Sequence, residues 1–217
     1  MAIELYVFPP SPRAFKVMAV ANHLDLDWTL QFIDLVTGDH KTPQYAELNP
    51  NMRIPTLKDG DFVLWESNAI CQYLAAKRPE SGLMPKDDRG QADVTRWQFW
   101  DIAQWDRACV TYIFEYIAKP RLMKGGEPNL AAVSQGAEPF HRAAKVLDSQ
   151  LKDRKFVTGD TLTVADFSLG APLIYAEMAH LPIETYAEIR RWFDALSALP
   201  AWQKTLGQSA PPAAVPA

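Results

Sequence analysis

The amino-acid sequence predicts an α/β plus all-α protein, in which a small α/β domain is followed by an all-helical domain. Residues 3–33 have the pattern of strand, helix and strand, and an Asp59-Gly60 hairpin signal then joins two further short strands. After residue 88 no strand signal of comparable quality returns. We therefore expect an α/β domain at residues 1–78, a linker at 79–87, a helical domain at 88–207 and a disordered tail at 208–217.

The first three predicted elements form a βαβ unit. The stretch IELYVF, residues 3–8, is rich in the β-branched and aromatic residues that strands favour. A helix follows from Pro12, because apolar residues recur at helical spacing in Ala14, Phe15, Val17, Met18, Ala21 and Leu24. WTLQFI, residues 28–33, is the second strand, and a right-handed crossover makes it parallel to the first.

A proline interrupts the next predicted strand, which follows a polar loop and spans RIPTL at residues 53–57. Proline lacks the N–H that a ladder needs, so Pro55 belongs at the start or edge of a strand, and an X-Pro bond is the common place for a cis peptide. A cis bond would leave the backbone of Ile54 exposed to a peptide-like ligand. The KDGD turn, another strand and a helix opened by Ser67 complete this domain.

The second domain is predicted from a long helix and a capping signal. Apolar and aromatic residues from Trp97 to Tyr116 recur as on a single helix. In TVADFSLG, Asp166 follows Thr163 by three residues, as in a capping box. The linker PESGLMPKDD precedes this domain, and SAPPAAVPA follows it.

Charge and cysteine content exclude several classes of protein. The chain of 217 residues has 22 Lys and Arg against 26 Asp and Glu, a formal charge of -4, which argues against a nucleic-acid or anionic-membrane partner. The opening MAIELYVF lacks the features of a secretion signal, so we expect a soluble cytoplasmic protein. Cys71 and Cys109 are far apart and the four His are scattered, so we expect neither a disulfide nor a metal site.

Ser11 is the first candidate for chemistry. It precedes Pro12 between the first strand and the first helix, which is typical of an N-cap, so a structural role is one interpretation. The other interpretation is an anion site, because a helix N-terminus offers N–H groups and a positive dipole beside the hydroxyl. The stretch FPPSPRAFKV holds no base that would make Ser11 a nucleophile, but a hydrogen-bond donor needs none.

Two further groups of residues suit the ends of a peptide-like ligand. Glu66 and Ser67 either cap a helix or hold an amino-acid head, with the acid facing an ammonium and the hydroxyl and amides facing a carboxylate. His40, Lys41 and Arg53 are either solvated or suit a second carboxylate. Together with the backbone of Ile54 and an anion at Ser11, these residues fit glutathione with its sulfur ionised.

The string GDHKTPQYAELNPNMRIPTLKDGDFVLWESNAI, the preceding SPRAFKV, and the later FVTGDTLTVADFSL and LPAWQKTL resemble the cytosolic glutathione transferases, most of all their phi class and its bacterial relatives. The resemblance covers nearly the whole chain. It implies a thioredoxin-like first domain, a helical second domain and a homodimer. It also implies that Ser11 stabilises the glutathione thiolate and that Ile54, ahead of cis-Pro55, pairs with the cysteinyl backbone. Glu66 and Ser67 would bind the γ-glutamyl end, and His40 and Lys41 would approach the glycyl carboxylate. Arg53 stands where the phi class usually has Gln, and Asn51-Met52 where it has Phe-Gly.

We therefore expect an enzyme of detoxification that adds glutathione, as co-substrate, to small apolar electrophiles. The alternatives are glutathione-dependent reduction of peroxides or disulfides, lyase chemistry at the same site, or a non-catalytic binding module. The wall of the second-substrate pocket is expected from Pro9, Pro10, Trp105, Tyr112 and Tyr116. Aromatic residues at helical spacing also suit a core, so that role remains open for the last three.

Overall fold

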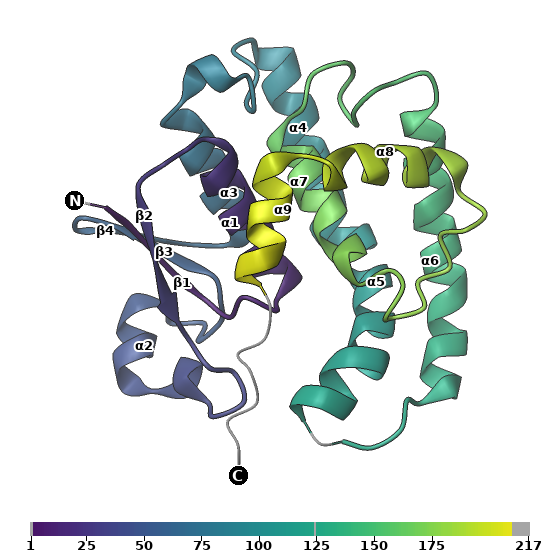
Figure 1. Cartoon of the computed structure of the whole chain (residues 1–217), viewed down its shortest axis with the longest axis horizontal. Coiled ribbons are helices and arrows are strands. Elements are labelled where there is room, and N and C mark those ends of the chain that lie inside the picture. The colour runs from purple at the N-terminus through teal and green to yellow at the C-terminus, as the bar shows by residue number, and fades with distance from the viewer. Residues whose placement is uncertain (1, 124, 210–217) are drawn as a thin grey trace. The chain divides into compact units, whose positions relative to one another are not determined.

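The chain divides into two compact units in the structure, a computed structural model that describes residues 2–123 and 125–209. Unit 1 contains the residues up to Ser81 together with those from Ala198 onward, and unit 2 contains Gly82–Ser197 (Figure 1). Of the predicted tail at 208–217, residues 210–217 lie outside the described residues, whereas Gln208 ends a helix.

A four-stranded sheet forms the centre of unit 1, in the order β2-β1-β3-β4. The strands are β1 (Ile3–Val7), β2 (Trp28–Phe32), β3 (Thr56–Asp59) and β4 (Phe62–Trp65). β1 and β2 are parallel, as the βαβ unit predicts, and β3 pairs antiparallel with both β1 and β4. Gly60 turns the β3–β4 hairpin with a φ of 65°, a conformation that glycine adopts without steric cost.

Three helices of unit 1 pack together on one face of this sheet: α1 (Pro12–His23), α3 (Ser67–Ala76) and α9 (Pro200–Gln208) (Figure 1). The rings of Phe15 on α1 and Trp202 on α9 meet edge to face, with centroids 4.7 Å apart. Asn22 of α1 also donates hydrogen bonds to Thr205 Oγ1 and Gln208 Oε1 of α9. The sequence placed this last helix with the helical domain, whereas these contacts join it to unit 1.

A short helix, α2 (Pro43–Leu48), occupies part of the segment that the sequence predicted to be a polar loop. Thr42 caps it by accepting a hydrogen bond from the Tyr45 backbone N–H, and Pro43 occupies the first turn. A 3₁₀ turn at Asp39–Lys41 precedes it. Thr-Pro is a recognised helix start, but six residues give too little apolar periodicity to reveal a helix.

Unit 2 is helical throughout its described elements. The predicted long helix runs as α4 (Asp88–Trp100), a π-helical segment at Asp101–Trp105, α5 (Asp106–Ile113) and a second π-helical segment at Phe114–Leu122 that contains Pro120. Three further α-helices follow: α6 (Leu130–Leu151), α7 (Val164–Gly170) and α8 (Ala187–Ser197). A 3₁₀ turn at Ala171–Tyr175 extends α7.

The predicted capping box at Thr163 and Asp166 is confirmed, and it lies in the core of unit 2. Asp166 Oδ1 accepts hydrogen bonds from the Val157 N–H and from Trp192 Nε1, each at 2.9 Å. Its Oδ2 accepts from the N–H and hydroxyl of Thr163. Burial raises the pKa of Asp166 and these donors lower it, with burial the larger effect.

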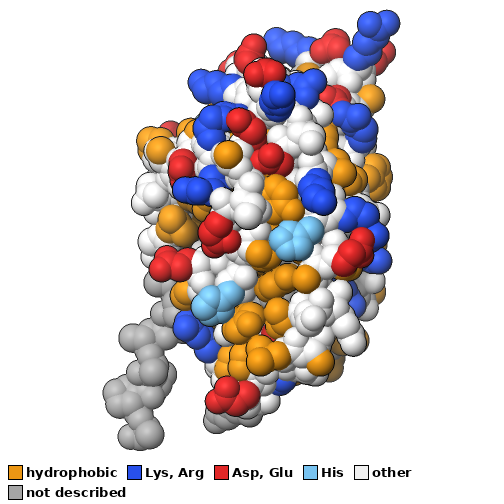
Figure 2. Space-filling view, turned by 90° about the vertical axis from the view of Figure 1, so that its right-hand side faces the viewer, with side chains coloured by type: hydrophobic (Ala, Val, Ile, Leu, Met, Phe, Trp, Pro, Cys, Tyr) orange, Lys and Arg blue, Asp and Glu red, His pale blue; other side chains and the backbone are white. Residues whose placement is uncertain are grey.

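The face of the molecule in Figure 2 has Lys and Arg side chains interspersed with Asp and Glu, while hydrophobic side chains gather in a band between them. Among the described residues, every helix is too short or too polar to cross a membrane.

Candidate functional site

A cavity of about 640 Å³ in unit 1 brings together five residues that the sequence analysis selected from separate motifs. They are Ser11, His40, Lys41, Arg53 and Ile54. They come from the start of α1, the 3₁₀ turn before α2 and the loop that leads into β3. The fold of unit 1 therefore gathers them around one space large enough for a small ligand.

Ser11 lines this cavity with a hydroxyl that does not cap α1. Its backbone N–H donates to the Phe8 carbonyl at 2.8 Å, which fixes the turn between β1 and the helix. The residue occupies the N-cap position, with φ -76° and ψ 129°, yet its side chain makes no capping hydrogen bond. The structural role considered for Ser11 thus does not use its hydroxyl, which is available to a ligand at the positive end of the helix.

The lining of the cavity is cationic. Arg13, Lys41 and Arg53 contribute side chains, and none of the lining residues is Asp or Glu. His40 contributes a buried Nδ1 atom that has no hydrogen-bond partner among the described residues. A buried polar atom without a partner costs free energy, so this atom is an unsatisfied group beside the cavity lining. The positive charge of the lining favours an anionic ligand.

Ile54 lies between the cavity and the sheet. The Ile54-Pro55 peptide bond is cis, as expected. The β1–β3 register covers Thr56 to Lys58, so Ile54 is outside that ladder. Its backbone groups therefore take no part in the β1–β3 ladder.

Glu66 and Ser67, at the end of β4 and the start of α3, do not line this cavity. The β3–β4 ladder ends at the pair of Thr56 with Trp65, and Glu66 and Ser67 follow Trp65 directly in the chain. Ser67, which is 5% exposed, is the first residue of α3, and Glu66 rather than Ser67 is the N-cap.

The backbone of Glu66 has a φ of 73°, in the left-handed region that a residue with a Cβ rarely adopts. Such a conformation costs roughly 1–3 kcal/mol and is concentrated at binding sites. This left-handed backbone at an exposed acid is compatible with a ligand-binding role for Glu66.

The residues predicted for the second-substrate wall have different surroundings. Trp105 is fully buried, and its Nε1 donates to the Leu169 carbonyl at 2.8 Å. Tyr112 is also buried and meets the ring of Phe140, whereas Tyr116 is half-buried against His180. The burial of Trp105 and Tyr112 fits the core role that their helical spacing also indicated.

In unit 1, Pro9 is buried and Pro10 half-buried in the turn that carries Ser11.

Four residues line the cavity without having been assigned a role from the sequence. They are Arg13, Leu35, Asn51 and Met52. Arg13 follows Ser11 by two residues, and this proximity was a usable signal. Leu35, Asn51 and Met52 belong to irregular segments, where sequence gives no side-chain direction.

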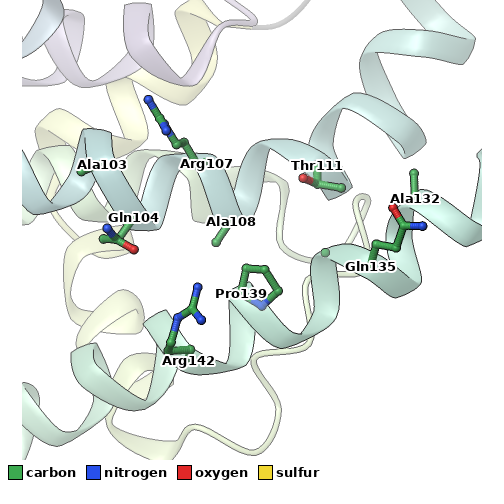
Figure 3. A pocket seen from close by; sticks show the side chains of 10 residues that line it. Ala103, Gln104, Arg107, Ala108, Thr111, Ala132, Gln135, Pro139 and Arg142 are labelled. Atoms are coloured by element: carbon green, nitrogen blue, oxygen red, sulfur yellow. The ribbon is translucent and has the colours of Figure 1, made fainter.

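A second cavity, of about 490 Å³, lies in unit 2 along α5 and α6 (Figure 3). Gly136 of α6 permits a close approach there, because a Cβ at this position would lie 3.0 Å from Thr111 Cγ2. Arg142, one of its charged residues, is paired with Glu138. The residues that line this cavity are not among those selected from the sequence, so the candidate site stays in unit 1.

Known proteins resemble both parts of the chain. Residues 1–76 match the family model of the glutathione S-transferase N-terminal domain, and residues 130–195 match that of the C-terminal domain. Glutathione S-transferase 3 of Zea mays is 32% identical over 209 residues, which cover 94% of this chain and 93% of that protein.

Solved structures give the same result. The apo structure of glutathione S-transferase III is 32% identical, covers 100% of both chains and superposes with a TM-score of 0.85. Glutathione S-transferase I from mais, solved with an atrazine glutathione conjugate, is 26% identical, with a TM-score of 0.87. That match covers 98% of this chain and 100% of the other.

Proposed function

Because this chain belongs to the glutathione S-transferase family, we propose that it binds glutathione in the unit 1 cavity and transfers the thiolate to small apolar electrophiles. The resemblance to the cytosolic members and their phi class, expected from the sequence, is confirmed by the matches. The thioredoxin-like fold followed by a helical domain is confirmed as well.

The observation that carries the proposal is the uncommitted hydroxyl of Ser11 in a cationic cavity. A free thiol with a pKa near 8.5 is only about 3% ionised at pH 7, and the thiolate is the nucleophile. In the proposed mechanism, Ser11 donates a hydrogen bond to the glutathione sulfur at the N-terminus of α1. The sulfur then attacks the electrophile and forms the new C–S bond, while the leaving group or opened ring takes the electron pair.

The other residues hold the peptide. Ile54 offers its backbone to the cysteinyl unit, with Pro55 setting the chain direction. Glu66 and Ser67 bind the γ-glutamyl ammonium and carboxylate. His40, Lys41 and Arg53, which line the cavity, bind the glycyl carboxylate. Pro9 and Pro10, in the turn that carries Ser11, are proposed for the side of the unit 1 site that receives the electrophile.

The test is an ultraviolet titration of glutathione bound to the enzyme, following thiolate absorbance. The proposal requires glutathione to bind with a thiol pKa about two units below that of the free peptide, since a charge-assisted hydrogen bond and a helix N-terminus supply about that much. A non-catalytic module would leave the pKa unshifted. A panel of aryl halides, epoxides, peroxides and mixed disulfides then separates conjugation from peroxidase, reductase or lyase activity.

We also propose that the chain is a cytoplasmic homodimer with a role in detoxification. Its acidic charge, its aromatic-rich long helix and its family support this assembly. Light scattering at micromolar concentration tests it, and a fully active monomer would contradict it.

A further inference from the structure

Two buried side chains, one in α2 and one at its C-cap, hold both ends of the segment that carries Ile54. Tyr45 and Asn49 are 3% and 2% exposed. The Tyr45 hydroxyl donates to the Arg53 carbonyl at 2.8 Å, and Asn49 Nδ2 donates to the same carbonyl at 2.7 Å. Both side chains also reach Thr56 Oγ1, at 2.9 Å and 3.2 Å. Arg53 and Thr56 stand immediately outside the Ile54-Pro55 pair, so the segment is fixed on either side.

These contacts form a closed hydrogen-bond ring whose donors are assigned by counting protons. The single hydroxyl proton of Tyr45 goes to the Arg53 carbonyl, so the Thr56 hydroxyl donates to the Tyr45 oxygen. Asn49 Nδ2 has two protons, one for the carbonyl and one for Thr56. Burial raises the pKa of Tyr45, which keeps its hydroxyl protonated through the neutral range. A ring in which each member is satisfied holds one geometry.

The side-chain oxygen of Asn49 also holds residues that line the cavity. Asn49 Oδ1 accepts hydrogen bonds from the N–H of Asn51 at 3.0 Å and from its side-chain amide at 3.2 Å. The Asn49 carbonyl accepts from the Met52 N–H at 2.8 Å. Asn51, Met52 and Arg53 all line the cavity. Asn49 therefore holds three successive lining residues through its side chain and its backbone carbonyl, as well as Thr56 at the start of β3.

We propose that Tyr45 and Asn49 are positioning residues for glutathione, which hold the Arg53–Thr56 segment so that the Ile54 backbone is prepared to pair with the ligand. The inference rests on the proposed function and adds to it two residues that do not line the cavity. Because neither residue contacts the sulfur, loss of the ring raises the KM and Kd for glutathione and leaves kcat at saturating glutathione nearly unchanged.

The test uses Tyr45→Phe, which removes one hydroxyl and keeps the ring. We expect Kd for glutathione, measured by calorimetry, to rise about three- to ten-fold, with kcat within about two-fold of wild type. Tyr186→Phe is the matched control. Tyr186 is 8% exposed, and its hydroxyl is 2.8 Å from His141 Nδ1 in unit 2, so the same deletion there should lower stability without changing Kd.

Thr56 provides a second, conservative pair of variants. Thr56→Ser keeps the hydroxyl and should keep affinity, whereas Thr56→Val should weaken binding as Tyr45→Phe does. The double variant Tyr45→Phe with Thr56→Val should lose less binding free energy than the sum of the two single losses, because both substitutions disrupt the same ring.

If the wild-type protein binds glutathione and Tyr45→Phe binds it with the same Kd, the positioning role is overturned and the proposed function is left intact. A wild-type protein that does not bind glutathione overturns both. A kcat that falls with an unchanged KM also contradicts the inference.

Discussion

Ser11→Ala removes the hydroxyl that is assigned to the glutathione thiolate while leaving the N-terminus of α1 in place. The Ser11 side chain makes no capping hydrogen bond, so its loss should change the free energy of unfolding by less than about 0.5 kcal/mol. A serine that capped the helix would cost about 1 kcal/mol on the same substitution. Urea denaturation therefore separates the two roles before any activity is measured.

The effect on the sulfur should be larger. A hydrogen bond to a charged group contributes roughly 1.5–3 kcal/mol, which corresponds to one to two pKa units. The amides of α1 continue to contribute roughly 0.3–1 kcal/mol in the variant. We therefore expect the pKa of the bound thiol to rise by about one to two units, and kcat/KM at pH 6.5 to fall about 10- to 100-fold.

The assay is a pH profile of conjugation with an aryl halide, together with thiolate absorbance. The wild-type rate should level off near neutral pH, while the variant should recover toward pH 9, where the thiol ionises unaided. Ser11→Thr keeps the donor and is the matched control. Full activity of Ser11→Ala at neutral pH, or a loss that is equal at every pH, would refute the reasoning.

Three further outcomes follow from particular residues. Glu66→Gly should raise the unfolding free energy by about 1 kcal/mol by relieving the left-handed backbone, yet raise the KM for glutathione; unchanged affinity would remove Glu66 from the site. Asp166→Ala should cost about 3–5 kcal/mol in urea melts because it leaves buried donors such as Trp192 Nε1 unpaired, and Asp166→Asn should cost less. Lys77 lowers the pKa of Asp59, whose negative charge raises that of Lys77. Asp59→Asn should therefore destabilise the protein between about pH 4 and pH 10, and the difference from wild type should disappear as pH falls through the lowered carboxyl pKa or rises through the raised amine pKa. A difference that persists at pH 2 would contradict this assignment.

Regular spacing explains which elements were predictable. The βαβ unit, the hairpin at Gly60 and the long helix have alternation or helical periodicity over enough residues to be recognised. α2 has six residues and only Tyr45 buried, so its signal reduces to Thr-Pro. The packing of α9 on unit 1 depends on Trp202 meeting Phe15, a contact between distant parts of the chain that periodicity does not encode.

The candidate site was predictable as a set of residue types but not as a geometry. The Ser11-Pro12 pair is compatible with a hydroxyl that caps the helix and with one that makes no capping hydrogen bond. The sequence does not distinguish these two roles, whereas the structure shows the second. Ser67 is the ordinary N-cap type, and the left-handed backbone that makes Glu66 the N-cap is a result of tertiary structure. The ring that joins α2 to the strand entrance requires a helix that the sequence analysis missed.

The membership of α9 in unit 1 has a consequence for how the protein is made. The ribosome produces α1 early, but Trp202, whose ring packs on Phe15, is synthesised only after all of unit 2. At roughly 5–20 residues per second, the interval between Ser81 and Pro200 lasts roughly 6–24 s. During that interval the α1 face that packs on α9 lacks this partner, so the completion of unit 1 depends on the last helix to be translated.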